Sequence, residues 1–110
     1  MTTQRVTSAQ ANDILSQVKY RFRVYSRATG STPKLVRNYE PYWGGGSIPY
    51  AILWEDGPTE WVCQALWGEP DPELLADDIR LTVPPLVPPL GTWLEAGTSF
   101  ILCIFPDSAL

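Results

Sequence analysis

Histidine is absent from the sequence, and cysteine is scarce. Histidine is the usual general base near neutral pH and the commonest metal ligand, so its absence excludes most nucleophilic and zinc-dependent mechanisms. The two cysteines, Cys63 and Cys103, lie in apolar surroundings and form no Cys-x-x-Cys pair. We therefore expect both to be reduced core residues, and we expect no metal site.

Long apolar runs are also missing. No run approaches the roughly 18 residues that cross a membrane, and residues 1–5 hold no apolar signal core, so we expect no membrane association and a cytoplasmic location. The 110 residues are 45% hydrophobic and 18% charged, values that are typical of a folded domain rather than a disordered chain. We therefore predict a single domain over residues 1–110.

Charge is divided unevenly along the chain. Residues 1–39 hold seven Lys and Arg side chains and one carboxylate, a net charge of +6, whereas residues 40–110 hold one Arg and eleven carboxylates, a net charge of −10. The acidic excess argues against nucleic-acid binding. The split fits either solvated surface charge or a basic and an acidic face that meet between copies in a head-to-tail contact.

The first 30 residues contain the clearest secondary-structure pattern. Five apolar residues recur at helical spacing: Ala11, Ile14, Leu15, Val18 and Phe22. They predict an amphipathic helix over about 8–20, with Thr7 and Gln10 at the spacing of a capping box. Residues 20–27 fit a helix and a strand equally well. If the helix continues, Gly30 supplies its C-cap.

The centre of the chain reads as a loop followed by a strand and a third element. Residues 28–47 are predicted to be loop because Gly, Ser, Thr and Pro cluster at both ends. The apolar run 48–54 predicts a central strand. After the Asp-Gly-Pro break, residues 58–68 fit a hairpin return or a short helix, and we favour the helix because Pro58 suits a first helical turn.

The last third is predicted to contain one more helix and three more strands. Asp71 begins a short helix, and residues 79–83 alternate as a strand. Residues 84–91 are a proline-rich extended connector, followed by a hairpin of 92–95 and 98–105 around a turn at 96–97. The predicted fold is α+β, with an antiparallel or mixed sheet of about four strands packed against the N-terminal helix.

Motifs for covalent and phosphate chemistry are missing. The G-x-S-x-G motif does not occur, and the three glycines at 44–46 lack the frame and the lysine of a phosphate-binding loop, so we expect no cofactor and no small-molecule ligand. Four carboxylates lie among aromatic residues, as in sugar-binding clefts: Glu40, Glu55, Asp56 and Glu60. A small hydrolase that uses a carboxylate pair is therefore one hypothesis.

Aromatic residues are concentrated in the centre, where seven of the 13 lie between positions 39 and 67. Trp54 and Trp61 are expected in the core. The aromatic side chains around Pro41 lie in a predicted loop. They either anchor an interface with a partner or pack back onto the core. Likewise, the P-x-x-P segment 85–88 is either an arm that binds a partner or a stiff connector within the domain. The basic stripe, which consists of Lys19, Arg23 and Arg27, is either a docking surface or a solvated face. The predicted partner-binding residues are Lys19, Arg23, Arg27, Tyr39, Tyr42, Trp43, Pro85 and Pro88.

One short segment resembles known sequences. Residues 54–61 read Trp-Glu-Asp-Gly-Pro-Thr-Glu-Trp, which is similar to a stretch found in small proteins of actinobacterial phages and prophages. The resemblance spans about a tenth of the chain and includes no catalytic motif. It implies a phage or mobile-element protein that acts in the cytoplasm of a bacterial host or is incorporated in a virion.

Three functional hypotheses follow from these observations. The first is a non-enzymatic interaction protein, a small virion or assembly component whose partners are other protein chains, including copies of itself. The second is a phage-encoded anti-defence inhibitor or ligand-sequestering protein, in which the acidic residues 69–78 mimic phosphates. The carboxylate-dependent hydrolase is the third.

Overall fold

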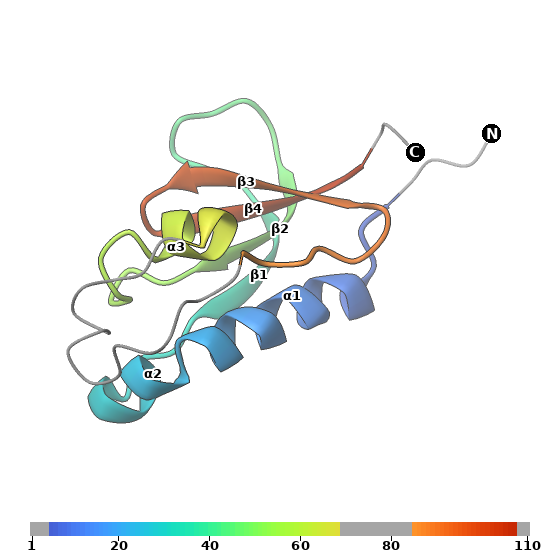
Figure 1. Cartoon of the computed structure of the whole chain (residues 1–110). Coiled ribbons are helices and arrows are strands. Elements are labelled where there is room, and N and C mark those ends of the chain that lie inside the picture. Colours follow the sequence, from blue (N-terminus) through green and yellow to red (C-terminus); the bar gives the residue numbers. More distant parts are fainter. Residues whose placement is uncertain (1–4, 69–84, 108–110) are drawn as a thin grey trace.

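The computed structural model describes residues 5–68 and 85–107, which form three helices and an antiparallel four-stranded sheet (Figure 1). The helices are α1 (Ser8–Arg21), α2 (Arg23–Thr29) and α3 (Trp61–Trp67), and the strands are β1 (Lys34–Tyr39), β2 (Ile48–Leu53), β3 (Thr92–Thr98) and β4 (Ile101–Pro106). The sheet order is β1-β2-β4-β3. The predicted α+β class is confirmed. The predicted helix from Asp71 and strand 79–83 lie outside the described residues.

The two N-terminal helices follow the predicted pattern and settle the ambiguous segment 20–27 as helical. Thr7 and Gln10 form the capping box, with distances of 2.8 and 3.1 Å between backbone nitrogen and side-chain oxygen. The helical conformation is interrupted at Phe22 (φ −107°, ψ 24°), which lies between α1 and α2. Gly30 then ends α2 at φ 75°, a left-handed conformation that glycine adopts without strain.

The segment expected to be a loop contains a strand, so this prediction was wrong for 34–39. β1 pairs with β2 along its length, with Leu35 opposite Ile52 and Val36 opposite Ala51. The side chains of β1 do not alternate regularly between buried and exposed. Near the end of the strand, the exposed residue Asn38 has a positive φ of 51°. Its structure depends on the pairing with β2, a central strand as predicted.

The C-terminal hairpin forms, but its turn lies further along the chain than expected. β3 continues through the predicted turn to Thr98, and the chain reverses at Ser99 and Phe100. The pairing shifts between Ala96 and Thr98, so Gly97 occupies an irregular position. A glycine inside an apparent hairpin turn therefore marks a strand irregularity instead.

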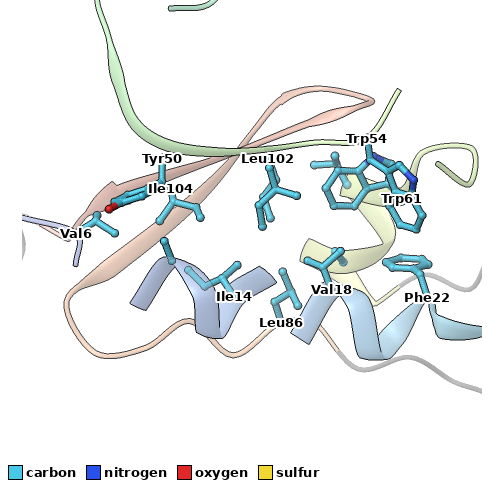
Figure 2. Close-up of a cluster of buried hydrophobic side chains, with 14 residues drawn as sticks. Val6, Ile14, Val18, Phe22, Tyr50, Trp54, Trp61, Leu86, Leu102 and Ile104 are labelled. Atoms are coloured by element: carbon cyan, nitrogen blue, oxygen red, sulfur yellow. The ribbon is translucent and has the colours of Figure 1, made fainter. Parts of the chain in front are cut away.

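The main core lies between one face of the sheet and the helices α1 and α3 (Figure 2). Ile14 and Val18 of α1 meet Leu102 and Ile104 of β4 in one buried cluster. At one end of this cluster, aromatic rings pack edge to face, with centroids 5.7 Å apart for Trp54 and Trp61. Trp54 and Trp61 are core residues, as predicted.

The tryptophan-bounded segment 54–61 connects β2 to α3. Gly57 lies directly against the Trp54 ring, because a β-carbon there would be 2.7 Å from Cδ2 of that indole. Pro58 is buried, and Glu60 turns the chain at φ 55° so that Trp61 begins α3. A helix forms here as predicted, but it begins at Trp61, so Pro58 precedes the helix and does not occupy its first turn. The Trp-Glu-Asp-Gly-Pro-x-Glu-Trp pattern therefore joins two core tryptophans through a tight turn.

Candidate functional site

The sheet has a second face that no helix covers within the described residues. Cross-strand partners point to the same side of a sheet, so the register brings Trp93 beside Phe105 and Glu95 beside Cys103 on this face. Cys103 in turn pairs with Ala51. The residues Ile48, Ala51, Ile101 and Cys103 form a small buried cluster here, separate from the main core. We call this side of the sheet the open face.

The loop between β1 and β2 partly covers the open face (Figure 1, top). A β-carbon on Gly97 would lie 2.8 Å from Cη2 of Trp43 and 3.0 Å from Sγ of Cys103. The Trp43 indole therefore rests on β3 where a side chain is missing. Trp43 is still 45% exposed, and Tyr42 packs against it with ring centroids 5.1 Å apart.

A hollow of about 340 Å³ lies between this loop and the β3–β4 hairpin. Its loop side consists of Pro41 and residues 43–48, including the three glycines, and its sheet side includes Glu95, Gly97, Cys103 and Phe105. We call it the aromatic groove. It combines ring faces, a thiol and one carboxylate. Trp93, the strand partner of the lining residue Phe105, is 54% exposed.

The charged group of the aromatic groove is Glu95. Its carboxylate is exposed and forms no hydrogen bond or ion pair with any residue that the structure describes. Burial, and secondarily the negative charge of Glu95, raise the pKa of the Cys103 thiol. The thiol therefore stays neutral near pH 7, whereas nucleophilic cysteines need a lowered pKa.

Along β3, Glu95 lies between two tryptophan side chains. Trp93 precedes it by two residues on the same face, and the Trp43 ring rests over Gly97, two residues beyond it. Two residues span about 7 Å of a strand. A cation placed over Glu95 would be within reach of both rings, the arrangement that favours Arg and Lys side chains.

The predicted aromatic anchors belong to this site, although not in the same way. Tyr42 and Trp43 lie in the loop, as expected. Tyr39 is the last residue of β1 and packs half-buried against the small cluster of the open face. The sequence did not single out Trp93, Glu95 or Phe105, because their grouping depends on the β3–β4 register.

The predicted basic stripe lies on α1 and α2, on the side of the molecule away from the open face. Lys19 and Arg27 are exposed. Arg23 lies over the Tyr20 ring, 4.2 Å from its centroid, and donates to the Tyr20 carbonyl at 2.8 Å. Tyr20 itself is 66% exposed. The interruption at Phe22 divides the stripe, with Lys19 on α1 and Arg23 and Arg27 on α2.

The described part of the proline-rich segment, 85–91, is attached to the helices. Gln17 of α1 donates to the Val87 carbonyl at 2.7 Å and accepts from the Val87 nitrogen at 3.0 Å. The Leu86 side chain is buried in the main core. Pro85 and Pro88 are exposed, and the carbonyl of Pro85 accepts from Arg21. The conformation is that of an anchored connector.

Two of the four carboxylates considered for hydrolysis come together. Glu55 and Asp56 line a cleft of about 290 Å³ together with Lys34, whereas Glu40 and Glu60 are not part of it. Glu55 and Asp56 are both exposed, and enzymes that use two carboxylates distinguish them by burying one. Lys34 provides a neighbouring opposite charge, so the cleft has the character of a solvated ion cluster.

Membrane-spanning helices and metal-binding clusters are both missing from the described residues. No helix there is long and apolar enough to cross a membrane. No group of three or more His, Cys, Asp or Glu side chains in residues 5–68 and 85–107 is arranged to hold a metal ion. Comparisons of the chain with protein-family models, curated proteins and solved structures find no match. The functional conclusion therefore depends on the geometry of the open face.

Proposed function

We propose that this protein is a non-enzymatic assembly component whose copies bind one another head to tail, with the aromatic groove of one copy receiving a basic side chain of the next. The observation that supports this most directly is the Glu95 carboxylate between Trp43 and Trp93, which has no ion-pair partner and no covering helix among the residues that the structure describes. Exposed aromatic residues that surround a charged group are typical of interface hot spots.

The second copy is the proposed occupant because the chain carries a complementary surface. Lys19, Tyr20 and Arg27 are exposed and Arg23 is half-buried, and together they give α1 and α2 a basic and aromatic surface. Arg27 is the proposed insert, since its side chain is exposed and forms no hydrogen bond, ion pair or ring contact with the described residues. Guanidinium groups stack on indole rings and pair with carboxylates.

The two surfaces lie on opposite sides of the molecule. α1 packs against the helix-covered face of the sheet through Ile14 and Val18, while Glu95 lies on the open face. A contact between opposite sides is heterologous, so each copy can bind two others and the assembly grows into a ring or a filament. This geometry suits a structural component of a virion, in agreement with the phage resemblance of residues 54–61.

Sedimentation velocity over a range of protein concentrations tests the proposal. We expect self-association that weakens with added salt, and we expect E95Q, W43A or W93A to weaken it about tenfold or more. W67A is the matched control, because Trp67 is 62% exposed on α3 and away from the open face. A protein that stays monomeric at high concentration and low salt would overturn the proposal.

Mixing two complementary variants distinguishes head-to-tail binding from a symmetric dimer. E95K retains the basic surface and R27A retains the aromatic groove, so neither variant should associate alone. Their mixture should give a heterodimer and nothing larger, since only one functional contact remains. Association that persists in either variant alone, or a mixture without heterodimer, would contradict the assigned surfaces.

The anti-defence hypothesis depends on the acidic residues 69–78, which lie outside the described residues. No described feature favours it over assembly.

A further inference from the structure

A second hollow, of about 300 Å³, lies at the end of the sheet where the chain enters α1. Arg5 lines it from the segment before α1, and Arg37 lines it from β1. Val6 and Tyr50 contribute the apolar part, and Figure 2 shows these two side chains next to each other at one end of the main core. The hollow belongs to the helix-covered side, and Ser47 is the one lining residue that it shares with the aromatic groove.

The charge in this hollow is uncompensated. Neither Arg5 nor Arg37 donates a side-chain hydrogen bond or forms an ion pair with the residues that the structure describes. None of the residues that line the hollow is acidic. Asp107 follows the lining residue Pro106 but is not part of the lining. Two like charges at one site repel each other, and a bound anion removes that repulsion.

Other groups in the hollow suit an oxyanion. Ser47 and Asn38 provide a hydroxyl and an amide on the wall formed by β1 and the glycine-containing loop. The first turn of α1, two residues beyond Val6, has no acidic side chain, so the positive end of the helix dipole adds to the field. Guanidinium groups bind phosphate and carboxylate oxygens in pairs of parallel hydrogen bonds.

We infer that this hollow is a binding site for a small phosphate monoester, held by Arg5 and Arg37. A phosphate monoester carries nearly two negative charges at neutral pH, which matches two guanidinium groups, whereas a carboxylate or sulfate ester carries one. A hollow of about 300 Å³ is at the lower end of small-molecule sites and suits a compact ligand. The ring of Tyr50 and the side chain of Val6 provide an apolar wall for the organic part.

Titration with phenyl phosphate at constant ionic strength, followed by backbone amide NMR and calorimetry, tests the inference. We expect saturable binding with amide shifts at Arg37, Asn38 and Ser47, and weaker binding of inorganic phosphate, which lacks the apolar part. Phenyl sulfate, a monoanion of similar shape, should bind at least about tenfold more weakly.

Variants assign the binding to the two arginines. R5Q and R37Q should each weaken phenyl phosphate binding about tenfold, and the double variant should abolish it. K34Q is the matched control, because Lys34 is an exposed cation on the same strand that lines a different cleft. Its affinity should stay within twofold of the parent protein. Equal losses in K34Q and R37Q, equal binding of the sulfate ester, or no saturable binding would each overturn the inference. Far-UV circular dichroism of each variant verifies the fold.

Discussion

Replacing Gly57 with alanine tests how tightly the Trp54 indole is held. A β-carbon on Gly57 would lie 2.7 Å from Cδ2 and 2.8 Å from Cγ of Trp54, well inside the usual contact distance between carbon atoms. These atoms are at the root of the indole, so the ring cannot turn aside without moving the whole side chain. Trp54 is 2% exposed and donates from Nε1 to the Ser31 hydroxyl at 2.8 Å.

Neighbouring rings also restrict Trp54. Its centroid lies 5.7 Å from those of Phe22, Tyr25 and Trp61, and each pair is close to edge to face. Overpacking a filled core destabilises by about 1–3 kcal/mol, and we place Gly57→Ala at the upper end because little around the ring can yield. For a chain of this size, about 3 kcal/mol lowers Tm by roughly 12 °C.

Urea unfolding, followed by far-UV circular dichroism, measures the effect. We expect a lower urea concentration at the midpoint and an unchanged dependence of the unfolding free energy on urea concentration. Gly97→Ala is the matched control. There the added carbon meets Cη2 of Trp43, the far end of a half-exposed side chain, and Sγ of Cys103. We expect a loss of about 1 kcal/mol for this control. A Gly57→Ala loss that does not exceed the control would refute the tight packing of Trp54.

Three further outcomes are expected. Gly97→Ala should displace the Trp43 ring and weaken self-association about fivefold or more in sedimentation velocity, because the ring rests on Gly97; unaltered association would remove Trp43 from the interface. Gln17→Ala removes both hydrogen bonds to the Val87 backbone and should cost about 1 kcal/mol. The Val87 amide should then exchange faster, whereas Ser16→Ala on the exposed side of α1 should leave that exchange unchanged. Because burial and Glu95 raise the pKa of the Cys103 thiol, a C63A protein should react with iodoacetamide more slowly than free cysteine at pH 8. The rate should rise with pH and in E95Q, and a rate equal to that of free cysteine would contradict the packing around Cys103.

Local signals in the sequence were sufficient for α1 and for the end of α2, but they did not decide between helix and strand in residues 20–27. The Thr7–Gln10 capping box and the Gly30 cap depend on neighbours within four residues, and both form. The short helix α3 ends before Gly68, as its sequence predicts, but it begins at Trp61 after Glu60 and not at Pro58. These signals act over one or two turns, so they can be read without knowledge of the tertiary structure.

The strands required information from distant parts of the chain. β1 has Lys34 and Arg37 within six residues, and the pattern alone does not distinguish it from a loop. It is a strand because β2 offers it a paired edge. In the same way, Ala96 and Gly97 favour a turn. β3 nevertheless continues past them, because Ala96 pairs with Leu102 and Thr98 pairs with Ile101. Local propensity therefore missed one strand and misplaced one turn.

For the same reason, only part of the candidate site could be predicted from the sequence. Tyr42 and Trp43 could be recognised from their position in a glycine-containing loop. Glu95 could not, because its location between two tryptophans depends on the β3–β4 register and on the close approach of the loop to Gly97. A single-residue slip would turn Glu95 toward the main core.

The edges of the sheet are poorly suited to strand pairing between copies, which favours the open face as the surface of the proposed association. β1 and β3 are the two edge strands. β1 carries Lys34, Arg37 and the positive-φ residue Asn38, and β3 is interrupted at Gly97. Charges and irregularities of this kind prevent edge-to-edge pairing. The open face, by contrast, already buries its own centre with no covering helix from residues 5–68 and 85–107, so in the proposed assembly a neighbour would add contacts at Trp43, Glu95 and Trp93. We therefore expect assembly through this face to be sensitive to salt.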